Sequence, residues 1–267
     1  MRFDMGTSDV LGADRHGSGD GPTVVLLHGF AQDRRCWGPL APALTAGRTV
    51  VTVDLPGHGA SAAFAHADLD RTVELLDATL VDVPDPLDVV GYSMGGRVAL
   101  TWLCARPERI GRLVTIGATG GIEDARQRAE RRAIDERRAA AVEHDGVDAF
   151  VEWWLGQEMF ARLPDWAHFD EERRSNTAAG LAGSLRHAGT GAMRPLWSQL
   201  ADVGRSTDPV PVLAIAGEAD PTFVGHAERI AASLGGTARI VPGAGHAVHL
   251  ERPEECVEAV IGFLGAR

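Results

Sequence analysis

Three residues that could form a nucleophilic site lie far apart in the chain, each directly after an apolar run. Ser93 stands in "GYSMG", Asp220 follows "PVLAIAGEA", and His246 follows "ARIVPGAG". The small residues Gly91 and Gly95 permit the tight strand-to-helix turn that exposes a serine hydroxyl. An imidazole oriented by a carboxylate activates such a hydroxyl, so the three residue types predict a catalytic triad.

Backbone donors for an oxyanion hole are expected nearby. The run "LLHGF" ends at Phe30, whose N–H can join that of Met94 to bind a developing negative charge. Two alternatives stay open for the triad. Asp220 stands in the turn-like "EADP", where it could be a turn residue without a catalytic role. His249 lies three residues after His246 and could be the catalytic histidine instead, although the position directly after "GAG" favours His246.

The elements that would position these residues alternate along the chain. Amphipathic stretches such as 69–81 and 97–105 separate the apolar runs, which predicts an α/β fold with a doubly wound, mostly parallel sheet. Ligands bind such sheets at the carboxyl ends of the strands. The alternation stops over 119–205, which we interpret as an inserted helical cap; 1–118 and 206–267 would form the core. Six runs read as strands: "TVVLLHGF", "TVVTVD", "PLDVVGYS", "IGRLVTIGA", "PVLAIAGEAD" and "ARIVPGAGH".

Composition excludes several classes of function. The net charge of −11 disfavours binding to nucleic acid or to an anionic membrane. No run of 18 apolar residues could span a bilayer, and the first 21 residues lack a signal-like apolar stretch, so a cytoplasmic location is expected. All 26 basic residues are arginine, which excludes Schiff-base and lysine-dependent phosphate-loop chemistry. The three cysteines show no metal-binding or disulfide spacing, and the oligomeric state cannot be predicted.

Arginines raise a separate question. Arg97 follows Ser93 by four residues, at the start of an expected helix, where a cation is unfavourable. An anion bound beside the nucleophile would explain it; pairing with Asp54 or Asp220 is the alternative. In the expected cap, "DARQRAERRAIDERRAA" carries six more arginines. Most must be solvated or paired, but a few facing inward would bind a substrate with several carboxylates.

The chain as a whole resembles the α/β-hydrolases. The motifs "GYSMGGR", "GGIEDARQRAERRAIDERRA", "FVEWW", "RRSN" and "LRHAGTGAMRPLW" resemble the MenH family, the 2-succinyl-6-hydroxy-2,4-cyclohexadiene-1-carboxylate synthases of the menaquinone pathway. Two positions differ from the family pattern: Thr222 stands where a lysine is usual, and Trp154 replaces a tyrosine.

The resemblance implies a lyase without a metal or an organic cofactor. Its small-molecule substrate is a succinyl-enolpyruvyl-cyclohexene carboxylate (SEPHCHC) with three carboxylates, from which pyruvate is expelled. Ser93 would act as the base, assisted by His246 and Asp220. The positions matching the family's substrate-binding residues are Tyr92, Arg97, Arg131, Trp153 and Arg174.

Three other functions remain open at this stage. A carboxylic-ester or thioester hydrolase needs the same triad and oxyanion donors, but has no evident use for Arg97. A lyase or cyclase of another pathway could use the same anionic pocket. A non-catalytic binding module would have no need of all three triad groups.

Overall fold

One sheet of seven strands organises the computed structural model, which describes residues 9–19 and 21–265. Residues 1–8, 20, 266 and 267 of the expected core segments lie outside the described residues. The strand order is β1-β3-β2-β4-β5-β6-β7. Every neighbouring pair is parallel except β1 and β3. The strands are β1 (Ala13–His16), β2 (Val24–Leu27), β3 (Val50–Val53), β4 (Leu87–Tyr92), β5 (Ile110–Ile116), β6 (Val212–Gly217) and β7 (Thr237–Val241).

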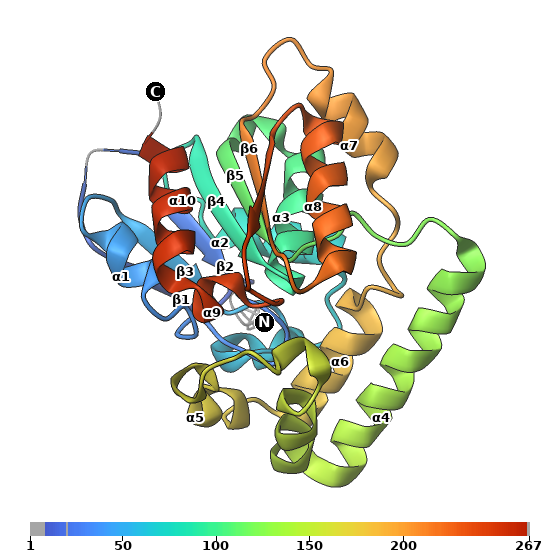
Figure 1. Cartoon of the computed structure of the whole chain (residues 1–267). Helices are drawn as coiled ribbons and strands as arrows, with labels where there is room; N and C mark the ends of the chain where they lie inside the picture. Colours follow the sequence, from blue (N-terminus) through green and yellow to red (C-terminus); the bar gives the residue numbers. More distant parts are fainter. Residues whose placement is uncertain (1–8, 20, 266–267) are drawn as a thin grey trace, which may run out of the picture.

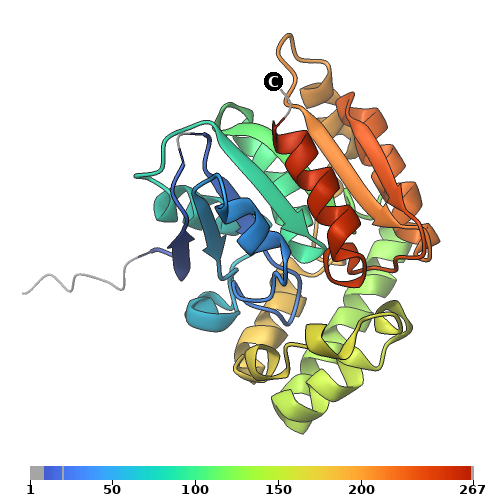
Figure 2. The same ribbon diagram turned by 60° about the vertical axis from the view of Figure 1, so that its left-hand side comes forward.

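Helices cover both faces of this sheet (Figures 1 and 2). On one face α1 packs against α10, and on the other α3 packs against α2 and α7, while α7 packs against α8. The predicted doubly wound α/β fold is therefore confirmed. The helices of the two faces are α1 (Leu40–Thr45), α2 (Leu69–Thr79), α3 (Met94–Ala105), α7 (Trp197–Gly204), α8 (Pro221–Leu234) and α10 (Pro253–Gly265), and the short α9 (Val248–Glu251) precedes α10.

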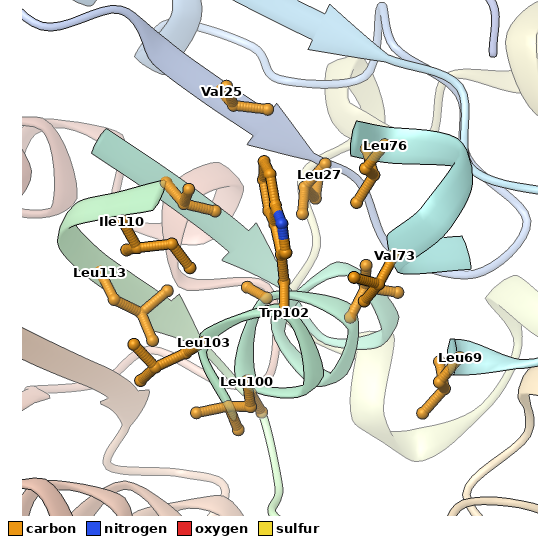
Figure 3. Packing of buried hydrophobic residues seen from close by; sticks show 14 of the residues in the cluster. Val25, Leu27, Leu69, Val73, Leu76, Leu100, Trp102, Leu103, Ile110 and Leu113 are labelled. Atoms are coloured by element: carbon orange, nitrogen blue, oxygen red, sulfur yellow. The ribbon is translucent and has the colours of Figure 1, made fainter. Parts of the chain in front are cut away.

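The central strands are buried on both faces, as their unbroken apolar sequences require. All four residues of β2 and all six of β4 are buried. Trp102 on α3 fills the layer between sheet and helices, where it packs among residues such as Leu76, Val25 and Leu27 (Figure 3). Its indole N–H donates to Asp77 at 3.0 Å, so the one polar atom of this ring is satisfied.

The chain between β5 and β6 contains α4 (Ala125–Leu155), α5 (Asp170–Arg174) and α6 (Ala178–Ala188) before α7. These three helices lie together at one end of the sheet, with α4 packed along α6 (Figure 1). The segment predicted as the cap, 119–205, therefore falls into two parts. Helices α4 to α6 lie beyond the ends of the strands, whereas α7 packs beside α3 and α8. Among the described residues, no helix is both long enough and apolar enough to cross a membrane.

Candidate active site

The turn from β4 to α3 raises Ser93 above the sheet. Ser93 has φ 50° and ψ −104°, a backbone conformation that residues other than glycine rarely adopt. Its neighbours must be small: a Cβ on Gly95 would lie 1.8 Å from the Leu27 carbonyl oxygen, and one on Gly91 would lie 2.4 Å from the Gly95 carbonyl oxygen. The sequence G-x-S-x-G is thus required by the close packing of β2, β4 and α3.

The structure brings the three predicted triad residues together. His246 Nε2 lies 3.0 Å from Ser93 Oγ, and His246 Nδ1 lies 2.9 Å from Asp220 Oδ2. The other Asp220 oxygen accepts the N–H of Phe223 at 3.4 Å and so caps α8, whose positive end favours a carboxylate. His249 forms no hydrogen bond with Ser93 or Asp220, since both of its ring nitrogens lack a hydrogen-bond partner among the described residues.

Glu251 holds the loop that carries His246. Its carboxylate accepts the N–H of Gly245 at 2.5 Å and that of Ala247 at 2.9 Å, so the backbone is held both before and after His246. Gly117, with φ 57°, provides the space beside the ring, because a Cβ there would lie 3.1 Å from His246 Cε1. Glu251 is not predicted from the sequence, because its position five residues after His246 is only a weak signal.

Two buried histidines fix the loop that carries Phe30. His28 Nε2 accepts the Leu55 N–H at 2.9 Å, so Nδ1 carries the proton and donates to the Gly29 carbonyl at 2.7 Å. His58 Nε2 accepts the N–H of Ala31 at 3.1 Å. Burial lowers the pKa of His28 to about 4 and that of His58 to about 3, so both rings stay neutral at pH 7. The peptide that carries the Phe30 N–H and the peptide after it are therefore each hydrogen-bonded to a buried ring.

A cavity of about 280 Å³ opens above Ser93. Both predicted oxyanion residues, Phe30 and Met94, line it together with Ser93 and His246. No hydrogen bond joins the N–H of Phe30 or of Met94 to another part of the chain within 9–19 and 21–265. Two peptide donors beside a serine hydroxyl are suited to bind an oxygen that gains negative charge.

Three arginines line this cavity, but only one acidic side chain accompanies them besides Asp220. Asp135 accepts a hydrogen bond from Arg131 Nε at 2.9 Å and lies 3.6 Å from Arg138. Arg97 is 8% exposed and donates to the Ala188 carbonyl, not to Asp54 or Asp220. Burial, followed by the nearby Arg131 cation, lowers the pKa of Arg97 to about 10, so it remains charged at pH 7. The arginine cluster of Arg97, Arg131 and Arg138 thus carries more positive charge than Asp135 can neutralise.

The remaining predicted substrate-binding residues do not all reach the cavity. Tyr92 is buried, and its ring centroid lies 5.5 Å from that of His246. Trp153 is 45% exposed, and Arg174 forms ion pairs with Asp148 and Asp170. Their sequence neighbours turn inward instead: Trp154 lines the cavity, and Arg173 is 1% exposed. Successive helical side chains differ by about 100° in direction, so a one-residue offset decides which of them faces inward.

Comparison with known proteins agrees with this geometry. A model of the alpha/beta hydrolase family matches residues 24–259, and the chain therefore belongs to that family. The 2-succinyl-6-hydroxy-2,4-cyclohexadiene-1-carboxylate synthase of Escherichia coli O139:H28 is 32% identical, over 94% of this chain and 96% of that protein.

Two solved structures extend the comparison. MenH from S. aureus has a TM-score of 0.86 and 30% identity, covering 95% of this chain and 97% of its own. A hydrolase from Pseudomonas aeruginosa PA01 has a TM-score of 0.74 and 29% identity, covering 95% and 94%. Within the alpha/beta hydrolases, the chain is thus similar to the MenH group, and the expected resemblance is confirmed.

Proposed function

We propose that the protein is a carbon–oxygen lyase of menaquinone biosynthesis, which eliminates pyruvate from SEPHCHC. The observation that carries this proposal is the arginine cluster in the same cavity as Ser93, His246 and Asp220. An ester hydrolase acting on neutral substrates would gain nothing from buried guanidinium groups, whereas a tricarboxylate supplies the anions that they lack. The similarity to synthases of this reaction supports the same assignment.

In the proposed reaction, Ser93 removes the proton α to the succinyl ketone and His246 takes up the hydroxyl proton of Ser93. Asp220 orients the imidazole and stabilises its charged form. The resulting enolate oxygen would be held by the N–H groups of Phe30 and Met94. Collapse of the enolate forms the new ring double bond and breaks the C–O bond, and the released enolpyruvate takes up a proton to become pyruvate.

The arginine cluster would bind a carboxylate of this substrate. Arg131 and Arg138 already share Asp135, so a further carboxylate would neutralise part of the positive charge that remains in the cavity. A planar guanidinium group binds a carboxylate through two parallel hydrogen bonds, which also fixes the substrate's orientation above Ser93.

Pyruvate release from SEPHCHC, followed with a lactate dehydrogenase couple, tests this proposal. A short-chain nitrophenyl ester is assayed in parallel with the same preparation. We expect fast pyruvate release and negligible ester cleavage. Ester cleavage without pyruvate would instead identify a serine hydrolase, and the proposal would then be wrong.

A further inference from the structure

The segment 188–191, at the end of α6, forms part of the wall of the large cavity of about 280 Å³ above Ser93. Gly189 and Thr190 line this cavity together with the arginine cluster. The carbonyl of Ala188 accepts the hydrogen bond of Arg97. The segment therefore lies directly against the cluster, although its own side chains carry no charge.

Asp135, the acidic partner of the arginine cluster, holds this segment on both sides of Thr190. Its Oδ2 accepts the N–H of Gly191 at 3.2 Å. A Cβ on Gly189 would lie 2.8 Å from the same Oδ2, and one on Gly191 would lie 2.3 Å from the backbone nitrogen of Arg132. Close packing against α4 thus requires both glycines, and it fixes the backbone that carries Thr190.

The hydroxyl group of Thr190 has no hydrogen-bond partner among the described residues. Thr190 is only 8% exposed, so its side chain has little access to bulk water. Two other hydroxyl groups of the cavity wall are engaged: that of Ser184 donates to Met94 Sδ at 3.4 Å, and that of Thr119 accepts a backbone N–H at 3.1 Å. A valine would fill position 190 with the same shape and leave no buried hydroxyl unpaired. Since buried polar groups are normally bonded, we look for the partner of Thr190 in the cavity.

The proposed substrate carries a hydroxyl group next to a carboxylate. The synthases to which this chain is similar are named for a product with a carboxylate on ring carbon 1 and a hydroxyl on ring carbon 6, which are neighbouring atoms. The proposed elimination neither forms nor breaks the bond to this hydroxyl, so SEPHCHC already carries it. With the ring carboxylate at the arginine cluster, the hydroxyl must lie at the part of the cavity wall beside the cluster.

We propose that Thr190 is a specificity-determining residue, which binds the ring hydroxyl of the substrate while the arginine cluster binds the neighbouring carboxylate. This inference rests on the proposed function for the identity of the substrate. A threonine hydroxyl both donates and accepts hydrogen bonds, as the ring hydroxyl does, so the two groups are complementary whichever supplies the proton. A ring acid without the hydroxyl would leave Thr190 unpaired in a site closed to water, and would bind more weakly.

Equilibrium binding of simple ring acids tests the role of Thr190 without requiring turnover. 2-Hydroxycyclohexanecarboxylate, used as its separate cis and trans forms, carries a hydroxyl next to a carboxylate, and cyclohexanecarboxylate is the matched ligand without the hydroxyl. Dissociation constants are measured by NMR titration. The variants Thr190→Val and Thr190→Ala remove the hydroxyl of the protein, and Thr190→Ser keeps it. Thr237→Val is the control, because it removes an exposed hydroxyl from the edge strand β7.

We expect the wild type, Thr190→Ser and Thr237→Val to bind one form of the hydroxy acid about three- to tenfold more tightly than cyclohexanecarboxylate, the effect of one hydrogen bond. Thr190→Val and Thr190→Ala should bind the two acids equally, with an affinity for cyclohexanecarboxylate within about twofold of the wild type. The proposal is wrong if the wild type shows no preference, or if the preference persists in both variants. It is also wrong if these variants weaken both acids alike, since Thr190 would then contact the carboxylate. Thermal melting identifies a variant that fails to fold, and the other then decides the result.

Turnover of SEPHCHC gives a second readout. The ring hydroxyl is the same in the substrate and in the transition state, so its contact with Thr190 contributes equally to both. Thr190→Val should therefore raise KM by about three- to tenfold and leave kcat within about twofold of the wild type. A fall in kcat with an unchanged KM would contradict the proposal. If the wild type releases no pyruvate, the lyase assignment fails, whereas a hydroxyl preference that depends on Thr190 would still be measured in the binding experiment.

Discussion

Ser93 is held in a conformation that is costly for a residue with a side chain, at roughly 1–3 kcal/mol. The surrounding contacts impose it: the Ser93 N–H donates to the Ile116 carbonyl at 2.8 Å, and Gly95 donates to that of His28 at 3.0 Å. This strain aims the hydroxyl at His246 instead of into the sheet, so the geometry of the pair is set before any ligand binds.

Replacing Ser93 with alanine removes the proposed base and leaves the backbone of the turn unchanged. We expect Ser93→Ala to reduce the rate of pyruvate release by about 10³-fold or more, since triad groups act as a unit. Thermal melting should match that of the wild type. Retention of a tenth of the wild-type rate would show that another group removes the proton.

Arg97 is expected to act on binding of the anionic substrate. Arg97→Met removes a charged hydrogen-bond donor worth about 1.5–3 kcal/mol, so kcat/KM for SEPHCHC should fall by about 10- to 100-fold. The control is Arg194→Met, which removes an exposed arginine paired with Asp70 at 3.0 Å. An unchanged kcat/KM in Arg97→Met would contradict the proposed role of the arginine cluster.

At the residue scale, the sequence predicts the meeting of Ser93, Asp220 and His246 better than it predicts which side chains of the inserted helices turn inward. Ser93, Asp220 and His246 each follow a strand, and the parallel sheet forces the ends of its strands to one edge. No such constraint applies to Trp153 and Trp154, or to Arg173 and Arg174. The rotation of each helix is set by packing against residues distant in sequence, so adjacent residues of the same type cannot be told apart beforehand.

At the scale of elements, strand β1 differs from the other six, because its sequence does not predict a strand. Ala13–His16 pairs antiparallel with β3 at the sheet edge, and its polar sequence "ADRH" gives no apolar signal. Polar residues are expected on an edge strand, where they discourage pairing with other chains. The buried strands are predictable because burial on both faces demands continuous apolar residues.

Helix α6 packs against the core through a close contact between two backbone segments, at Gly180 and Gly57. A Cβ on Gly180 would lie 2.2 Å from the carbonyl oxygen of Gly57, and neither backbone segment can move away as a flexible side chain would. Through this contact α6 brings Ala188, the acceptor of the Arg97 hydrogen bond, to the large cavity.

We therefore expect Gly180→Ala to destabilise the protein by about 1–3 kcal/mol and to raise KM for SEPHCHC. The matched change Gly225→Ala lies within α8, where nothing stands within 4 Å of the new methyl group. It should stabilise the fold by roughly 0.5–1 kcal/mol. Urea unfolding measures both effects, and equal shifts in the two variants would refute the role of the Gly57 contact.

At the scale of the whole molecule, buried histidines tie stability to pH. Burial lowers the pKa of His249 to about 3, and that of His28 and His58 to about 4 and 3, against an ordinary 6.5. Above pH 7 the rings are neutral in both folded and unfolded chains. Below about pH 6.5 the unfolded chain takes up protons that the folded protein cannot, so the free energy of unfolding falls as the pH falls.

Between pH 7.5 and 5.5 each of these histidines should lower the free energy of unfolding by about 1.4 kcal/mol. Urea unfolding at the two pH values measures the sum, about 4 kcal/mol from the three rings. His249→Leu should reduce this pH dependence by about one third, because it removes one titrating ring whose nitrogens make no hydrogen bond. Gly225→Ala, which changes no titrating group, is the control, and should leave the pH dependence unchanged.

The groups of the proposed proton transfer and most members of the arginine cluster come from different parts of the chain. Ser93, Asp220 and His246 follow strands β4, β6 and β7, whereas Arg131 and Arg138 belong to the chain between β5 and β6. After a gene duplication, mutations confined to that one segment could alter which anion is accepted and leave the proton-transfer groups in place. New substrates can then be acquired by small steps, because no intermediate has to lose its chemistry first.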